Sequence, residues 1–237
     1  MSMLIFPVDA APERRSRAAR RGCAGLCKRA IDVIVSTFGL VVLSPFFALV
    51  AIAIKLDSPG PVLFWQDRVG VNRRRNGAVP PPSGEQRQLN RYGRKIRVCK
   101  FRSMVDDAEN DTGPVWAKDG DSRITRAGRI LRKTRVDEFP QLWNVLRGEM
   151  SLVGPRPERF FFVRKLEEVL PGYAQRCDVM PGITGLAQVK RGYDSSIESA
   201  NAKLQYDLYY ARNQRLLLDL KIMAATVKVM ARGEGAH

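Results

Sequence analysis

The acidic pair most suited to chemistry in this chain is Asp137 and Glu138, within RKTRVDEFPQLWNVLRGEMSLVGPRPE (132–158). Adjacent helical residues point about 100° apart, so the two carboxylates are expected to do different jobs. Pro140 is tolerated in the first turn of a helix, which predicts a helix that begins just before it. Both carboxylates would then lie at the positive end of that helix, which should lower their pKa values. The pair is either an ordinary N-terminal cap or a nucleophile beside a metal ligand.

The residues that follow the pair favour the chemical interpretation. Residues 150–153 are predicted to form a strand, and Gly154-Pro155-Arg156-Pro157 directly after it should form a rigid turn. Prolines restrict the backbone on both sides of Arg156. A guanidinium held in this way loses little entropy when it binds a phosphate through two parallel hydrogen bonds. We therefore predict that Arg156 binds phosphate.

A second predicted turn and a basic helix would complete such a site. The turn PGITG (181–185) offers backbone amides and the Thr184 hydroxyl, with Gln188 nearby. The segment before the acidic pair is predicted to be helical and carries arginines at spacings of three and four. Arg129 and Arg132 are weaker candidates there for the same phosphate, and the alternative is a solvated helix face. Fixed cations, one carboxylate that holds a metal and one free carboxylate form the set that phosphoryl transfer needs.

Composition limits the partners of the chain. Its 237 residues are enough for one or two domains with a core, and a hydrophobic content of 45% is ordinary for a globular protein. The formal net charge of +16 favours polyanions such as anionic lipid, phosphorylated substrates or nucleic acid. Aromatic residues make up 8% and do not alternate with the arginines, so no platform for stacking bases is predicted. Four cysteines and one histidine show neither zinc spacing nor a disulfide framework.

One hydrophobic segment predicts contact with a membrane. Residues 33–54 (VIVSTFGLVVLSPFFALVAIAI) carry no charge and are long enough to cross a hydrocarbon core of about 30 Å as a helix. Pro45 interrupts this helix, and Ser44 can cap the carbonyl groups that the interruption frees. The flanks on both sides are basic, and the positive-inside tendency would keep both in the cytoplasm. We therefore expect a helix that enters the membrane, breaks at Ser44-Pro45 and returns.

The remaining segments predict a small α+β domain that is mostly helical. Residues 60–70 and 95–104 have the composition of strands, and the polar segment between them that of a loop. An apolar stripe at helical spacing between Leu217 and Met230 predicts a helix that packs on the domain or lies on a membrane surface. The predicted boundaries are a disordered basic arm over 1–25, a re-entrant membrane helix over 26–55 and a cytosolic catalytic domain over 56–237, with a mobile loop over 71–94 and an amphipathic helix over 213–231.

Several motifs together resemble one protein family. The Ser-Pro-interrupted segment is followed in order by KFRSM (100–104), RVDEFPQLWNVLRGEMSLVGPRPE (135–158), PGITGLAQV (181–189) and LQYDLYYARN (204–213) with LLLDLKI after it. In these motifs the chain is similar to the bacterial sugar transferase family. Its members are monotopic phosphoglycosyl transferases, undecaprenyl-phosphate sugar phosphotransferases of exopolysaccharide biosynthesis.

The resemblance implies a reaction and roles for single residues. Such enzymes transfer a sugar-1-phosphate from a UDP-sugar to polyprenyl (undecaprenyl) phosphate with Mg²⁺ and release UMP, at the cytoplasmic face of the bacterial inner membrane. By the family's pattern, Asp137 attacks phosphorus and forms a covalent intermediate, and Glu138 helps to hold the metal. Arg102, in KFRSM, joins the residues expected to bind phosphate or nucleotide. The alternative is a non-catalytic basic membrane adaptor for anionic lipid or nucleic acid, which would leave the acidic pair without a role. The sugar and the oligomeric state, a homo-oligomer included, stay open.

Overall fold

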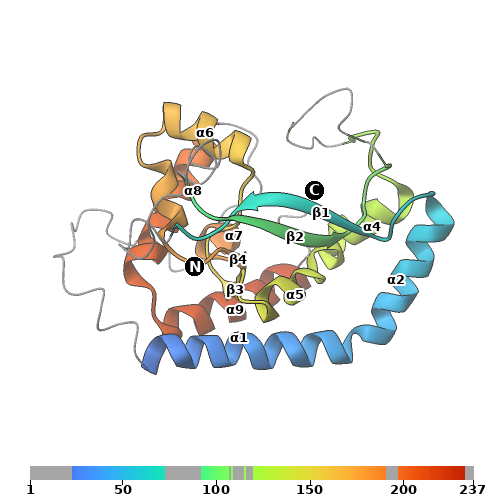
Figure 1. Cartoon of the computed structure of the whole chain (residues 1–237), viewed down its shortest axis with the longest axis horizontal. Helices are drawn as coiled ribbons and strands as arrows, with labels where there is room; N and C mark the ends of the chain where they lie inside the picture. Colours follow the sequence, from blue (N-terminus) through green and yellow to red (C-terminus); the bar gives the residue numbers. More distant parts are fainter. Residues whose placement is uncertain are drawn as a thin grey trace.

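The computed structural model describes residues 23–72, 92–106, 108, 115, 120–190 and 197–232. The predicted α+β architecture, mostly helical, is confirmed in this part of the chain (Figure 1). Its elements are α1 (Cys23–Val42), α2 (Ser44–Asp57), β1 (Leu63–Val69), β2 (Lys95–Phe101), α4 (Arg126–Thr134), the 3-10 turn η2 (Val136–Glu138), α5 (Gln141–Leu146), β3 (Ser151–Val153), α6 (Phe160–Val169), the 3-10 turn η3 (Tyr173–Asp178), β4 (Gly182–Thr184), α7 (Leu186–Lys190), α8 (Ile197–Asn213) and α9 (Leu216–Ala231). The predicted arm over 1–25 and loop over 71–94 lie almost entirely outside the described residues.

The hydrophobic segment forms two helices that meet at a bend of 60°. Figure 1 shows α1 along the base of the molecule and α2 rising from one end of it. Pro45 lies in the first turn of α2, where its missing N–H removes no helical hydrogen bond. The Ser44 hydroxyl donates to the Val41 carbonyl at 2.8 Å. Among the described residues no single helix is long and apolar enough to cross a bilayer, but the bent pair together reaches that length and hydropathy.

The described residues form two small sheets of two strands each. The antiparallel hairpin of β1 and β2, with Trp65 opposite Cys99, confirms the two strands that composition predicts. In the second sheet, β3 runs parallel to β4, with Val153 opposite Thr184.

The prediction that PGITG forms a turn is wrong, because its centre is the strand β4. These glycines allow two backbone segments to approach closely; they do not reverse the direction of the chain. A Cβ on Gly182 would lie 2.1 Å from the amide nitrogen of Gly154, and one on Gly154 would lie 2.2 Å from the Met180 carbonyl oxygen. No side chain fits at such distances, so glycine is required at both positions, one just after β3 and one at the start of β4.

Three buried apolar clusters in the described part join these elements. One links β2, α5 and β3 to α7, α8 and α9. A second links the end of β1 to α6, η3 and α8. The third packs α2 against β2 and α4 and includes an edge-to-face pair of Phe47 and Phe101 with ring centroids 5.4 Å apart. The second half of the hydrophobic segment is therefore fixed to the domain.

The C-terminal helix α9 shows a different buried face from the predicted stripe. Leu218 and Ile222 enter the core. Of the predicted stripe, Met223 packs against that core, whereas Leu217 is 67% and Val227 68% exposed. The prediction therefore holds for the helix, but most of its stripe faces outward.

Candidate active site

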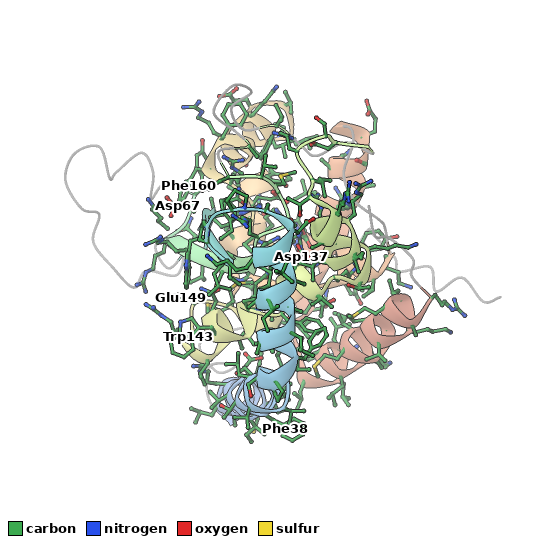
Figure 2. All side chains as sticks on the ribbon, turned by 90° about the vertical axis from the view of Figure 1, so that its right-hand side faces the viewer. Phe38, Asp67, Asp137, Trp143, Glu149 and Phe160 are labelled. Carbon is green, nitrogen blue, oxygen red and sulfur yellow. The ribbon has the colours of Figure 1, made fainter. Side chains whose placement is uncertain are left out.

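The acidic pair lies in a sharp turn between two helices. α4 ends at Thr134, and the next residue, Arg135, turns the chain into η2 with a φ of 59°, in the left-handed region that residues with side chains rarely adopt. η2 carries Asp137 and Glu138, and Pro140 leads from it into α5, so the predicted helix after the pair is confirmed. Figure 2 shows Asp137 beside α4, level with the upper part of α2 and well above Phe38 on α1.

Glu138 is held by two cations from other segments. Its Oε1 accepts from Lys100 Nζ on β2 at 3.0 Å, and both carboxylate oxygens accept from the Arg156 guanidinium, with 3.0 Å between Nη1 and Oε2. Burial alone would raise the pKa of Glu138, but Arg156 and then Lys100 outweigh it and hold this pKa well below its usual range. Glu138 is therefore a permanently charged anion at neutral pH.

Asp137 is buried but keeps its carboxylate available. Only 8% of the residue is exposed, and among the described residues no donor forms a hydrogen bond with its carboxylate. Burial, and next the negative charge of Glu138, raise the pKa of Asp137 to about 6. The prediction that the helix end lowers both pKa values is therefore wrong for Asp137, because desolvation and a neighbouring anion exceed the effect of a short helix. Above pH 6 the group is a partly desolvated carboxylate, the form suited to nucleophilic attack.

Asn144 on α5 sets the distance between the acidic pair and β2. It is fully buried, its Oδ1 accepts from the Cys99 amide at 2.9 Å, and its Nδ2 donates to the Arg97 carbonyl at 2.7 Å. These bonds fasten α5 to the edge of β2 that does not face β1. Lys100, one residue beyond Cys99, is thereby carried to Glu138.

Lys100 is a site residue that our sequence reasoning did not single out, although a signal for it exists. Side chains alternate between the two faces of a strand. Ile96 and Val98 on β2 are buried, and Lys100 is next in the same register. A lysine at a core-facing register position needs a partner, and here the partner is Glu138.

Arg68 on β1 is the second residue that sequence reasoning missed. Its Nη1 donates to the Pro157 carbonyl at 3.1 Å and lies 3.4 Å from Glu158 Oε2. Burial lowers the pKa of Arg68, and Glu158 acts against this shift. Arg68 thus supports the chain just beyond Arg156. Nothing in the sequence distinguishes Arg68 from the many surface arginines.

The two arginines predicted on α4 differ in position. Arg132 is half-buried, and its charge is among those that oppose the rise in the pKa of Asp137, so it acts on the acidic pair. Arg129 is exposed one turn earlier.

Three other predicted phosphate ligands have different contacts. Arg102 is buried and donates from Nη2 to the Ser58 carbonyl at 2.7 Å, and from Nη1 to Pro59, so it ties the end of β2 to the end of α2. The Thr184 hydroxyl pairs with Thr226 of α9 at 2.7 Å. The Gln188 Nε2 donates to the Ile183 carbonyl at 3.0 Å, and its buried Oε1 has no partner in the described part of the chain. None of these bonds reaches the acidic pair, and the phosphate-binding role of the three residues stays a prediction.

The donor set around the acidic pair can be tested for fit to Mg²⁺. A carboxylate has about four lone-pair positions, of which Glu138 uses three for Lys100 and Arg156 and keeps one on Oε2. Asp137 next to it is free. Over the described residues no group of three or more acidic, histidine or cysteine side chains forms a metal cage. This set fits an ion that takes one or two carboxylates and completes its shell with water and substrate phosphates, as Mg²⁺ does.

Comparison with known families identifies the chain. The sequence profile described as "Bacterial sugar transferase" matches residues 23–233. The chain belongs to the bacterial sugar transferase family. The resemblance predicted from the motifs is thereby confirmed, and all residues of the acidic pair and its cations fall within the matched range.

The chain is similar to curated proteins from several bacteria, among them the following three. A "UDP-N-acetylgalactosamine-undecaprenyl-phosphate N-acetylgalactosaminephosphotransferase" of Aeromonas hydrophila is 40% identical over 210 residues, which are 89% of this chain and 45% of the relative. "Exopolysaccharide production protein PSS" of Rhizobium leguminosarum bv. phaseoli is 42% identical, over 88% of this chain and 97% of the relative. A "UDP-glucose:undecaprenyl-phosphate glucose-1-phosphate transferase" of Caulobacter vibrioides is 36% identical, over 98% and 82%. The chain thus spans under half of the Aeromonas protein and nearly all of the Rhizobium protein.

Proposed function

We propose that this chain transfers a sugar-1-phosphate from a UDP-sugar to undecaprenyl phosphate and releases UMP, as the first membrane step of exopolysaccharide or glycoconjugate biosynthesis. The observation that carries the proposal is the free, partly desolvated carboxylate of Asp137 beside the fixed group of Glu138, Lys100 and Arg156. The names of the relatives support the donor and acceptor classes. Because those names differ in the sugar, the sugar of this chain is left open.

In the first half of the reaction, an Asp137 oxygen attacks the phosphorus that bears the sugar. A bond forms between this oxygen and phosphorus, the bridging P–O bond of the diphosphate breaks, and UMP leaves with the electron pair. The product is a sugar phosphate linked to Asp137 as an acyl phosphate. Arg156, Lys100 and Arg132 are the cations placed to stabilise the charge that develops on the phosphoryl oxygens.

In the second half, an oxygen of undecaprenyl phosphate attacks the same phosphorus. The acyl P–O bond breaks, the carboxylate of Asp137 is restored, and the sugar diphosphate stays on the lipid. Dividing the transfer in two lets a water-soluble donor and a lipid acceptor use one site in turn. α2, which packs against the elements around the site, offers the lipid an apolar path to it.

Mg²⁺ is the proposed cofactor, with Glu138 and the substrate phosphates as its ligands. When bound it would neutralise phosphate charge as a Lewis acid. In this arrangement Glu138 would serve two purposes, since it also holds Arg156 in place.

The proposed location of the protein is the cytoplasmic face of the inner membrane, with α1 and α2 forming a re-entrant hairpin. Large apolar side chains are exposed along both helices and along α9: Leu26, Ile34, Val35, Phe38, Val41, Val42, Phe46, Leu49, Ile52, Leu56, Leu217, Leu220, Val227 and Met230. Such extensive exposure marks a surface that a membrane or another protein covers. Single cysteines near residues 25 and 60 should react only from the cytoplasmic side, and labelling of either from the periplasm would exclude the re-entrant arrangement.

The decisive experiment is the intact mass of the protein after incubation with UDP-sugar alone. Wild type should gain the mass of a sugar phosphate, and Asp137→Asn should gain nothing, because the amide is not a nucleophile. An adduct on both proteins, or on another residue, would rule out Asp137 as the nucleophile. A basic membrane adaptor is the alternative function, and it predicts no UMP release by purified wild type in detergent with any UDP-sugar.

A further inference from the structure

Arg29, on the first helix, binds the far end of α5. Its Nη1 donates to the Val145 carbonyl at 2.6 Å and its Nη2 to the Leu146 carbonyl at 2.7 Å. These carbonyls end the helix that begins just after the acidic pair, and a cation is favourable at this negative end. One guanidinium therefore ties α1 to α5, the helix that follows Glu138.

Two other side chains of α1 bind β3. The Asp32 Oδ1 accepts from the Leu152 amide at 3.0 Å and from the Ser151 hydroxyl at 3.2 Å. Lys28 Nζ donates to the Val153 carbonyl at 3.2 Å. The other edge of β3 pairs with β4. The strand is therefore fixed between β4 and α1.

A buried network from α8 and α9 fixes Lys28 in turn. Lys28 Nζ lies 2.8 Å from Asp219 Oδ2. The Tyr210 hydroxyl oxygen lies 2.7 Å from Asp219 Oδ1 and 3.0 Å from the Val153 carbonyl oxygen, so these two acceptors share its single proton. Tyr210 is 1% and Asp219 3% exposed. Burial, and then Asp219, raise the pKa of Tyr210, so its hydroxyl remains a donor. The end of β3 thus has two anchors, Lys28 from α1 and Tyr210 from α8, and Asp219 of α9 binds both of them.

We infer that Lys28, Arg29 and Asp32, together called the α1 clamp, are positioning residues that set the distance between Arg156 and the acidic pair. The inference rests on the proposed transferase function. Arg156 follows β3 by three residues, and α5 follows Glu138 by three residues. The clamp holds β3 on one side and α5 on the other, so the first helix fixes both partners of the Arg156–Glu138 pair without touching either.

The chemical consequence follows from how sharply transfer depends on geometry. A displacement of about 1 Å in a reacting group can lower the rate about a hundredfold. The paired hydrogen bonds of Arg156 to Glu138 tolerate little displacement, since the planar guanidinium must face the carboxylate. Loosening the clamp should therefore slow the chemical step and leave the binding of the UDP-sugar largely intact.

Three variants test this inference in the full chain in detergent or nanodiscs, and two of them have a matched control at another residue. Arg29→Lys can reach only one of two carbonyls, and its control is Arg147→Lys, at the end of the same helix in a surface pair with Glu149. Tyr210→Phe removes only a hydroxyl, and its control is Tyr206→Phe, one turn earlier on α8. Asp32→Leu removes an acceptor, and Asp32→Asn, which keeps an oxygen at Oδ1, should lose less kcat than Asp32→Leu.

The measurements are kcat and KM for the UDP-sugar, the melting temperature, and the sidedness of a cysteine near residue 60. At a temperature well below melting, the three test variants should lose roughly tenfold to a hundredfold in kcat with KM nearly unchanged, by the geometric argument above. The controls should match wild type, and the cysteine should label from the same side in all.

Several outcomes would overturn the inference. A wild-type kcat in Arg29→Lys and Tyr210→Phe, while wild type releases UMP, would show that the α1 clamp has no part in positioning. A loss of kcat that the controls share would assign these residues to general stability. A loss of kcat that appears only when the cysteine labels from the other side would assign them to membrane topology. Should Asp32→Leu fail to fold, the other two variants decide. Absence of UMP release by wild type would instead refute the proposed function.

Discussion

Replacing Arg156 by lysine separates its charge from its shape. Arg156 donates hydrogen bonds to both oxygens of Glu138, whose side chain is 6% exposed. Lysine would keep the charge but offers a single ammonium group, so at best one of the two bonds remains. A hydrogen bond to a charged group contributes about 1.5–3 kcal/mol. Since each 1.36 kcal/mol is a factor of ten in rate, kcat/KM should fall roughly 10- to 150-fold.

Replacing Arg156 by alanine should cost more than replacing it by lysine. Glu138 would keep only Lys100 as a partner in a buried position. Removal of one partner from a buried ion pair costs about 3–5 kcal/mol, which corresponds to roughly a hundredfold to several thousandfold in rate when the loss falls on the transition state. Part of the loss should appear as a lower melting temperature, because the uncompensated charge also destabilises the fold.

The assay is the initial rate of UMP release at saturating and limiting UDP-sugar, with undecaprenyl phosphate present. Arg164→Lys is the control, because Arg164 is exposed on α6 and forms no ion pair in the described part of the chain. Wild-type kcat/KM in Arg156→Lys would refute the reasoning and leave Arg156 as a general positive charge. Equal losses in the lysine and alanine variants would show that the charge by itself contributes nothing.

Three further predictions test other parts of the structure. With Cys23 replaced by serine, a maleimide should label the exposed Cys27 first, because burial raises the pKa values of Cys99 to about 11 and Cys177 to about 12. The measurement is an intact-mass time course, and simultaneous labelling of the three cysteines would contradict the burial of Cys99 and Cys177. Gly182→Ala should lower the melting temperature by about 2–12 °C, whereas Gly39→Ala, whose new Cβ meets only the end of Leu142, should change it little. Mg²⁺ should bind tightly only with the UDP-sugar present, so a strong calorimetric signal from Mg²⁺ alone would indicate a protein cage not found among the described residues.

The sequence predicted those features that depend on local patterns. The strands β1 and β2, the helix after Pro140 and the helix near the C-terminus follow from composition and spacing. Asp137 and Glu138 could be singled out because paired carboxylates are unusual among so many arginines. The motif around Arg156 could be singled out because prolines restrict the backbone on both sides of this residue.

Features that depend on tertiary contacts were not accessible in this way. Arg102 and Lys100 are two residues apart in one motif, yet Lys100 binds Glu138 while Arg102 binds the end of α2. Which of the two cations faces the carboxylate depends on how β2 twists and on which element packs against its edge. Asn144, 45 residues away in the sequence, holds α5 against that edge through its bond to the Cys99 amide. The glycines of PGITG were misinterpreted because glycine occurs both where a chain turns and where two backbones approach closely.

The opposite pKa shifts of two adjacent carboxylates indicate how their roles divide. Arg156 and Lys100 both bind Glu138, so its charge is fixed and its pKa is low. Asp137 shares the burial but not the hydrogen bonds, and the anion beside it raises its pKa further. A carboxylate that is desolvated and lacks hydrogen-bond donors is the more reactive of the two, because no bond to the protein must break before it attacks. Glu138 meets the opposite requirement: it keeps two cations in place while an anionic substrate enters and leaves. Exchanging the two residues (Asp137→Glu with Glu138→Asp) should therefore abolish transfer while leaving both charges, because each role depends on where its carboxylate lies relative to Lys100 and Arg156.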